Sequence, residues 1–444
     1  MPEQSESFEE RINLLHEELS FAIEWQRPSI LLVFYESGYI QARVELALKK
    51  RLAAIGQQMV HFSVDERHFD IARLLSKRPN RDHAIFSVTG LSLGGGKEGA
   101  NAYRALNIRR EYFVDYAMRV IIWLTNEEAV ELSRHAPDFW AFRHRVVEFN
   151  DSLDHEHSLI SADDLTGRSE GFPNQPEDVD QQIELHKTFL TNLPKQTAFS
   201  ARRLDPLSGL ALLYRAKAAY DRSLQSSRRG ISTAKQLNDT EALARFWGIL
   251  GLTYLDLNQL NRAIRAYWKA IRYTPQDAGL WSGLGKAYLV KGRTKAARRV
   301  LEEAIKVNPQ DASAWIDLGH CYRIEKRVSD AIITYQKAIQ VAPRVPFAHL
   351  SLAACYRLLG KENIAEEQKN LAQPMIEKGT EFQRAVFESV CGNPGKAIDL
   401  LAIALEMNQV RLNWLRCDPN LDFIRDDPRF ERLYGQAAPN SREN

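Results

Sequence analysis

Short runs of apolar residues alternate with stretches of helical periodicity through the first 150 residues of the chain. In the periodic stretches the apolar residues recur every three or four positions, which is the spacing of one face of a helix. Helices are expected at residues 7–25, 38–54, 69–76, 100–116 and 127–134. The apolar runs predict strands at Ser29–Tyr35, Met59–Val64, Ala84–Val88, Arg119–Leu124 and Arg145–Phe149. This alternation favours an α/β domain over residues 1–150, with a mostly parallel sheet covered by helices on both faces.

A pattern with a period of 34 residues fills the second half of the chain. Trp247, Trp281 and Trp315 are 34 residues apart, and His349 holds the same place in a fourth period. Leucine, glycine, tyrosine, alanine and proline recur at fixed offsets from these residues. Among them are Gly251, Gly285 and Gly319; Tyr254, Tyr288, Tyr322 and Tyr356; and Pro275, Pro309 and Pro343.

This pattern resembles the tetratricopeptide repeat (TPR), which has tryptophan, leucine-glycine, tyrosine, alanine and proline at these offsets. The resemblance implies four helix–turn–helix units over residues 244–377, and an all-α solenoid built by stacking them. The units begin near Ala244, Ala278, Ala312 and Pro346. Because repeats of this kind serve many unrelated partners, the resemblance defines a fold and leaves the function open.

The segments between and beyond these two regions are less regular. Residues 151–200 are expected to form a linker with one helix at 177–193. Residues 201–243 carry an incomplete helical hairpin, which we interpret as a degenerate repeat that caps the array. Residues 378–436 are expected to form another degenerate repeat and the C-terminal capping helices. In this last segment Phe423, Phe430 and Leu433 are candidates to seal the end of the core.

Composition and charge narrow the possible partners. The chain of 444 residues has 59 Lys and Arg against 57 Asp and Glu, so its net charge of +2 gives no indication of a nucleic-acid partner. No apolar run approaches the roughly 18 residues that span a membrane, and the acidic N-terminus lacks the apolar segment of a signal peptide. The four cysteines show no C-x-x-C spacing, and Cys321 and Cys355 share one place in successive repeats. We expect buried free thiols and a cytoplasmic protein.

A second resemblance covers about residues 25–150. The stretches RPSILLVFYESGYIQARVELALKKRL, RALNIRREYF, RVIIWLTNEEA and HAPDFWAFRHRVVEF resemble the NTPase-type domain found before TPR units in bacterial signalling ATPases of the NACHT and STAND kind. In this family the turn after the first strand carries G-x-x-x-x-G-K-[ST], which holds phosphate and Mg²⁺. Here the turn is Tyr35–Gln41, with one glycine and no lysine. The resemblance therefore implies a degenerate NTPase-like domain that has no cofactor and is not an enzyme.

A second glycine-rich stretch, Gly90–Gly99, allows a different hypothesis. Its candidate anion-binding residues are Gly94, Gly95, Gly96 and Lys97. If backbone N–H groups and Lys97 bound phosphate there, the protein would be a nucleotide-regulated signalling switch. A flexible loop is the favoured interpretation, because the stretch follows the third strand and Glu98 stands where a phosphate loop has Ser or Thr. The pair His155 and His157 is a weak metal motif in a polar segment, and we expect no metal site.

Helical spacing assigns one face of the first helix of each repeat to a concave groove. The candidate groove residues are Arg245, Leu252, Lys286, Leu289, Ile316, His320, Arg323, Phe347, Leu350 and Arg357. Aliphatic residues beside basic ones suit a partner peptide or helix with apolar anchors and acidic groups. The favoured hypothesis is thus a non-enzymatic scaffold or adaptor that binds another protein. An alternative for the groove is that the linker helix 177–193 occupies part of it.

Overall fold

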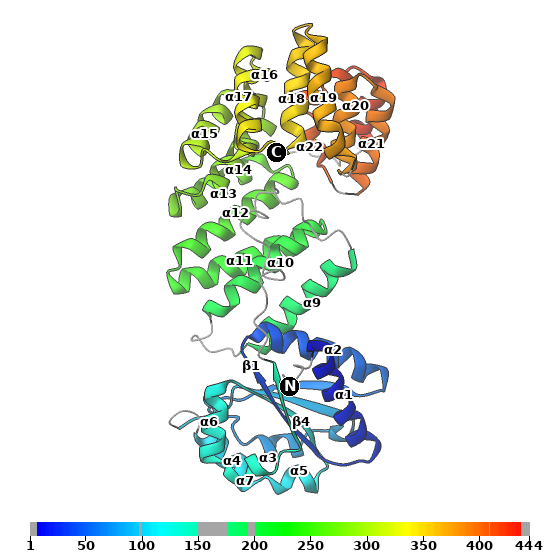
Figure 1. Cartoon of the computed structure of the whole chain (residues 1–444). Helices are drawn as coiled ribbons and strands as arrows, with labels where there is room; N and C mark the ends of the chain where they lie inside the picture. Colours follow the sequence, from blue (N-terminus) through cyan, green and yellow to red (C-terminus); the bar gives the residue numbers. More distant parts are fainter. Residues whose placement is uncertain are drawn as a thin grey trace, which may run out of the picture. The chain divides into compact units, whose positions relative to one another are not determined.

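The computed structural model describes residues 7–96, 100–149, 176–193, 200–377, 379–407 and 409–436 (Figure 1). These residues form two compact units, the first ending at Leu210 and the second beginning at Ala211. The first unit is a parallel sheet with helices, and the second is all-helical. This confirms the predicted fold class.

The sheet of the first unit has five parallel strands in the order β2-β3-β4-β1-β5. Their bounds are β1 (Ser29–Tyr35), β2 (Gln58–Ser63), β3 (Ala84–Thr89), β4 (Arg119–Leu124) and β5 (Arg145–Phe149). The interior strands β3 and β4 are buried along their whole length, while the edge strand β2 is half-exposed. The continuous apolar runs of the sequence are therefore the strands that helices cover on both faces.

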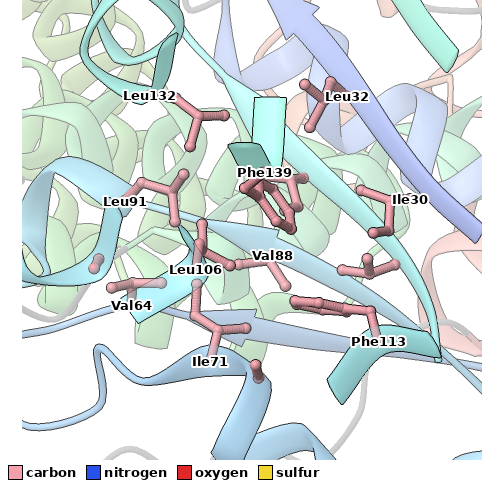
Figure 2. Close-up of a cluster of buried hydrophobic side chains, with 14 of the residues drawn as sticks. Ile30, Leu32, Val64, Ile71, Val88, Leu91, Leu106, Phe113, Leu132 and Phe139 are labelled. Atoms are coloured by element: carbon pink, nitrogen blue, oxygen red, sulfur yellow. The ribbon is translucent and has the colours of Figure 1, made fainter. Parts of the chain in front are cut away.

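Alternate residues of each strand contact different helices. Leu31 and Val33 pack with α1 (Phe8–Glu24) and α2 (Gly38–Ala54) on one face. Ile30 and Leu32 pack with the helices of the other face. Those helices are α3 (Ile71–Ser76), α4 (Ala100–Ile108), α5 (Glu111–Asp115), α6 (Asn126–His135) and α7 (Pro137–Ala141). Figure 2 shows this second cluster, with Phe113 and Phe139 beside the strand residues.

Two short 3₁₀ helices and one interrupted helix complete the α/β part. The 3₁₀ helices are η1 (Arg81–His83) and η2 (Leu91–Leu93). The single helix expected over 100–116 is two helices, α4 and α5. Between them the backbone bonds tighten to three-residue spacing, as Tyr112 N donates to Arg109 O at 3.0 Å and Phe113 N to Arg110 O at 3.1 Å.

Helix α9 (Pro176–Asn192) also belongs to the first unit, where it packs against α2. The rings of Phe189 and Tyr39 are stacked, with centroids 4.4 Å apart. The helix was expected at 177–193 as part of a linker, and its apolar side instead covers the start of α2. The 3₁₀ helix η6 (Ala201–Arg203) and helix α10 (Leu204–Ala216) follow, and the boundary between the units falls within α10.

Helices of the second unit come in consecutive pairs that pack against each other. The helices of the four regular repeats are α12 (Thr240–Asp256), α13 (Leu260–Tyr273), α14 (Ala278–Val290), α15 (Thr294–Val307), α16 (Ala312–Ile324), α17 (Val328–Val341), α18 (Pro346–Leu358) and α19 (Glu362–Ile376). The flanking elements are α11 (Tyr220–Leu237), α20 (Glu381–Cys391), α21 (Pro394–Glu406), α22 (Leu412–Leu415), η7 (Pro419–Ile424) and α23 (Pro428–Gln436). Three aspartates, Asp239, Asp277 and Asp311, cap the N-termini of α12, α14 and α16.

The tryptophan and proline positions of the repeat are joined by hydrogen bonds. Trp281 Nε1 donates to Pro275 O at 2.8 Å, and Trp315 Nε1 donates to Pro309 O at 2.9 Å. In the fourth repeat His349 Nε2 makes the corresponding bond to Pro343 O at 3.0 Å. His349 thus keeps the ring N–H that fixes the turn between two repeats.

Small residues let the two helices of a repeat approach closely. A Cβ added at Gly251 would lie 2.9 Å from the ring of Tyr267, and one at Gly285 would lie 2.6 Å from Leu301. The glycine positions of the pattern are therefore required by packing. The thiols of Cys321 and Cys355 are free and fully buried, as expected, and burial raises the pKa of Cys355 to about 11.

Candidate functional site on the inner face of the repeats

The ten predicted groove residues lie on the first helices of the repeats. We call the side of α12, α14, α16 and α18 that carries them the inner face. Five of them are buried, namely Leu289, Ile316, His320, Arg323 and Leu350. The other five are half-buried, namely Arg245, Leu252, Lys286, Phe347 and Arg357. Leu289 and Ile316 are buried by the helices of the repeats themselves. Arg323 and Leu350 are buried in part by a segment from outside the four regular repeats.

A segment near the C-terminus provides much of this cover. Residues 411–424, which include α22 and η7 and which we call the clasp, lie against the inner face. Arg323 makes the closest contacts with the clasp. Its Nη1 donates to Asn420 Oδ1 at 2.6 Å and its Nη2 to Pro419 O at 2.7 Å, and only 2% of its side chain is exposed.

Asn420 is the centre of the contact. It is fully buried, and its carbonyl oxygen accepts from Ser389 Oγ at 2.8 Å. Its side-chain Nδ2 donates to Ser351 Oγ at 2.9 Å, while its backbone N–H donates to Asp418 Oδ1 at 2.8 Å. With Arg323 on Oδ1, both ends of the side-chain amide and both backbone polar groups have partners. Three helices, α16, α18 and α20, supply the partners outside the clasp.

Two titratable groups beside Asn420 are buried. Burial raises the pKa of the Asp418 carboxyl to about 6, although the Asn420 N–H and the Arg323 charge act in the opposite direction. Burial also lowers the pKa of His320 to about 3, and the charges of Arg323 and Lys286 add to this effect. His320 is therefore neutral at pH 7, with Nε2 at 3.4 Å from Ser351 Oγ.

The first part of the clasp reaches the first regular repeat. Asn413 Nδ2 donates to Leu255 O at 2.9 Å, and Arg411 Nε lies 3.8 Å from Asp256 Oδ1. Asp256 also accepts from Arg215 Nε at 2.7 Å. The Lys286 ammonium lies 6.0 Å from the centre of the Trp414 ring, at the outer limit of a cation–π contact.

Arg357 and Phe423 form the contact at the other end of the clasp. The guanidinium of Arg357 lies 4.7 Å from the centre of the Phe423 ring and donates to Val390 O at 2.6 Å. Phe423 packs against the cluster of Ala353, Ala354 and Val390. The sequence made Phe423, Phe430 and Leu433 candidates to seal the end of the core. Phe430 and Leu433 lie in the C-terminal cluster, and Phe423 packs in a separate cluster on α18 and α20.

Sequence analysis missed the clasp as the occupant of the inner face. Its central residues Asp418, Pro419 and Asn420 have the composition of an exposed turn, and Ser351 and Ser389 carry no signal of their own. The linker helix was considered as the occupant, and α9 packs on α2 within the first unit. The prediction that the ten residues bind a partner stays a prediction.

In the first unit, α9 covers the turn between β1 and α2. A Cβ added at Gly38 would lie 2.6 Å from the Phe189 ring. Ser37 Oγ accepts from Ile40 N at 3.3 Å, so a side chain already caps the N-terminus of α2. This is the turn at which the NTPase-like resemblance would place a phosphate.

A buried carboxylate anchors the end of α9. Glu45 accepts hydrogen bonds from Asn192 of α9 and from Ser87 of β3, and its Oε1 lies 3.4 Å from His61 Nδ1. Burial alone would raise the pKa of Glu45, but the bonds from His61, Ser87 and Asn192 outweigh it and lower the pKa. The carboxylate is therefore ionised at pH 7 and tied to α9.

The candidate anion-binding loop is described only in part. Gly95 and Gly96 have positive φ, and Gly94 packs against Ala102. The carboxylate of Glu128 already accepts from the backbone N and the hydroxyl of Ser92 in this loop. Lys97 lies outside the described residues, as do His155 and His157, so anion binding stays a prediction.

No group of three His, Cys, Asp or Glu side chains in the described ranges is placed to hold a metal ion. Within those same ranges, no helix combines the length and apolar character needed to cross a membrane.

Comparison with known proteins supports the repeat assignment. A family model described as tetratricopeptide repeat matches residues 282–349, and one described as TPR repeat matches residues 251–292. Residues 251–349 therefore carry tetratricopeptide repeats, as the sequence pattern indicated. No curated protein sequence matches the chain.

Several solved structures are similar to part of the chain. The crystal structure of MamA is 25% identical and covers 38% of this chain and 95% of its own, with a TM-score of 0.33. YrrB, titled a TPR protein with an unusual peptide-binding site, is 20% identical over 41% of this chain and 91% of its own, with a TM-score of 0.32. TTC0263 of Thermus thermophilus, a thermophilic TPR protein, is 24% identical over 42% of this chain and 98% of its own, with a TM-score of 0.36.

Proposed function

We propose that the protein is a non-enzymatic interaction scaffold, or adaptor, that binds a peptide segment of a partner protein on the inner face of its repeats. The observation that carries the proposal is the clasp itself. A peptide segment lies on this face, and side chains of the repeats bind its main-chain carbonyls, as Arg323 does for Pro419 and Ser389 for Asn420. The inner face, together with α20, thus has the chemistry that peptide recognition requires.

The half-buried residues define where a partner would add contacts. Leu252 and Phe347 offer partly exposed apolar surface. Lys286 keeps 30% of its side chain exposed and lies 3.9 Å from Asp317. A partner with an apolar anchor and an acidic group fits this set, in line with the expectation from sequence.

A charge reversal tests the proposal. The full-length chain and its variant Lys286→Glu are used to capture proteins from a lysate of the source cells, and the captured proteins are quantified by mass spectrometry. We expect the variant to lose the bound partner by about tenfold or more, because a carboxylate would repel an acidic ligand. Lys295→Glu, at an exposed position on α15, is the matched control and should capture as the native protein does. Equal capture by all three would contradict the proposal.

The non-enzymatic part of the proposal has a separate test. It is supported by the absence of lysine from the turn Tyr35–Gln41 and by the Phe189 ring packed on Gly38. Calorimetric titration of the full chain with ATP and GTP in the presence of Mg²⁺ should give no binding in the micromolar range. Micromolar affinity that is lost in Lys97→Ala would instead establish the nucleotide-regulated switch.

A further inference from the structure

The contact around Asn420 contains more directed hydrogen bonds than a segment needs if it only caps the end of the helical array. A segment that only seals the end of a helical array needs apolar side chains, and the clasp has them in Leu421 and Ile424. Yet Arg323 and Asp418 are also buried in this contact. Removing charged groups from water is energetically costly, and apolar residues of the same size often stabilise a protein as well or better. In some proteins buried polar groups of this kind specify which segment and which register is bound.

The geometry defines a short recognition pattern. Arg323 binds two successive residues, the carbonyl of Pro419 and the side chain of Asn420. Aspartate in place of asparagine would lose the N–H₂ that donates to Ser351, and glutamine would be longer by one methylene group. Three residues after Asn420, the Phe423 ring lies between Arg357 and the alanines of α18. The pattern is Asp-Pro-Asn followed at the third position by an aromatic residue.

We propose that this Asn420 site is a recognition site for Asp-Pro-Asn segments, and that the partner protein carries such a segment, which takes the place of the clasp. This inference rests on the function proposed above and names the chemistry of the partner. The clasp is the resident ligand, held at an effective concentration on the order of millimolar because it is tethered. The partner overcomes that advantage through added contacts at Leu252 and Phe347, which the clasp leaves half-buried.

A labelled peptide provides the probe. The peptide has the sequence of residues 416–426 with Cys417→Ser and carries fluorescein, and binding to the full-length chain is followed by fluorescence anisotropy. The native chain should bind it weakly, because the tethered clasp competes. Asn420→Ala loosens the clasp, so this variant should bind the peptide about tenfold more tightly than the native chain. Adding Arg323→Ala to that variant should weaken peptide binding by about tenfold or more.

Two controls separate recognition from general loosening. A peptide with alanine at the position of Asn420 should not bind any variant. Asp426→Ala changes an exposed residue next to the clasp. In this variant the clasp should stay docked, and the peptide should bind as weakly as it does to the native chain. Circular dichroism and thermal unfolding show that each variant is folded. The unlabelled peptide, but not its alanine version, should also displace the captured partner.

The failures of the two proposals are distinguishable. If the folded Asn420→Ala chain does not bind the peptide, the clasp is a permanent cap and this inference is overturned. The scaffold function would stand in that case provided that Lys286→Glu still loses the partner. If the native chain forms a dimer by light scattering and Asn420→Ala is a monomer, the site exchanges clasps between copies, and the assignment to a partner protein is overturned.

Discussion

In both units a segment of the chain itself covers a surface, but by different chemistry. The first surface is the turn Tyr35–Gln41, for which the sequence predicts no phosphate binding, and the second is the inner face, for which it predicts a partner. In the first unit the cover is α9, whose Phe189 ring stacks on Tyr39 and packs on Gly38. In the second unit the cover is the clasp, which Arg323 and two serines bind through directed hydrogen bonds. Stacking depends mainly on apolar area and accepts many rings, whereas hydrogen bonds to an amide accept few substitutes. The turn of the first unit is thus closed by ring packing, whereas the clasp of the second unit is held by bonds that few other side chains could make.

The largest effect is expected for a substitution that removes the hydrogen bonds holding the clasp. Arg323→Ala removes the donors to Asn420 and Pro419 and the positive charge near the buried Asp418. We expect clasp docking to lose about 3–5 kcal/mol, the usual cost of leaving buried polar groups unpaired. Hydrogen exchange of residues 411–424, followed by mass spectrometry, should accelerate accordingly. Arg344→Ala, at an exposed position, should leave this exchange rate unchanged, and protection that survives Arg323→Ala would show that apolar packing alone holds the clasp.

The apolar cover is tested by Phe189→Ala. This change removes the stacked ring from Tyr39 and Gly38, and we expect a loss of about 3 kcal/mol in the docking of α9. Hydrogen exchange of residues 179–192 should speed up, while that of the clasp should not change. Gln181→Ala, on the exposed side of the same helix, is the control. A wild-type exchange rate in Phe189→Ala would mean that the bond from Asn192 to Glu45 suffices.

The two covers should respond to pH in opposite directions. The pKa of Asp418 is raised from 3.8 to about 6, so docking is favoured by protonation and loses stability as pH rises through 6. Between pH 7 and pH 5 the second unit should gain about 1 kcal/mol of unfolding free energy, and Asp418→Asn should remove this gain. The pKa of Glu45 is lowered below 4.5. Its contribution is present above that pH and is lost as pH falls through the folded-state pKa.

Denaturant unfolding at several pH values measures both effects. Glu45→Gln should flatten the acid side of the profile of the first unit. If the stability of both units changed in the same direction with pH, at least one of the two buried carboxylates would not control its covering segment.

The smallest effects are expected from removing one hydroxyl group at each covering segment and comparing the losses in unfolding free energy. Ser389→Ala removes the donor to the buried Asn420 carbonyl and should cost about 1 kcal/mol. Tyr39→Phe keeps the stacked ring and removes only a long contact of 3.4 Å to His186 Nδ1, so it should cost less than about 0.5 kcal/mol. Denaturant unfolding of both variants measures the difference. Equal costs would show that the first cover also depends on directed bonds.

Sequence pattern predicted the fold because the fold depends on periodicity. The strands from Ser29 and Arg119 and the repeats around Trp281 and Trp315 follow from apolar spacing that is local in the chain. The clasp depends on pairs such as Arg323 with Asn420, which are 97 residues apart, and no local pattern reports such a pair. Composition gives no signal there either, since an Asp-Pro-Asn run is typical of an exposed turn, whereas Asp418 and Asn420 are buried here.

The contact between Asn413 and Leu255 has a mechanical consequence. In a repeat array each repeat contacts only its neighbours, so the terminal repeats, which have one neighbour each, can unfold separately from the rest. Here a bond joins residues 158 positions apart, from the C-terminal segment to the first regular repeat. This bond and the contacts of the clasp with α16, α18 and α20 oppose fraying of either end of the array. The array should therefore unfold more cooperatively than one whose repeats contact only their neighbours, and a ligand that releases the clasp would reduce that cooperativity.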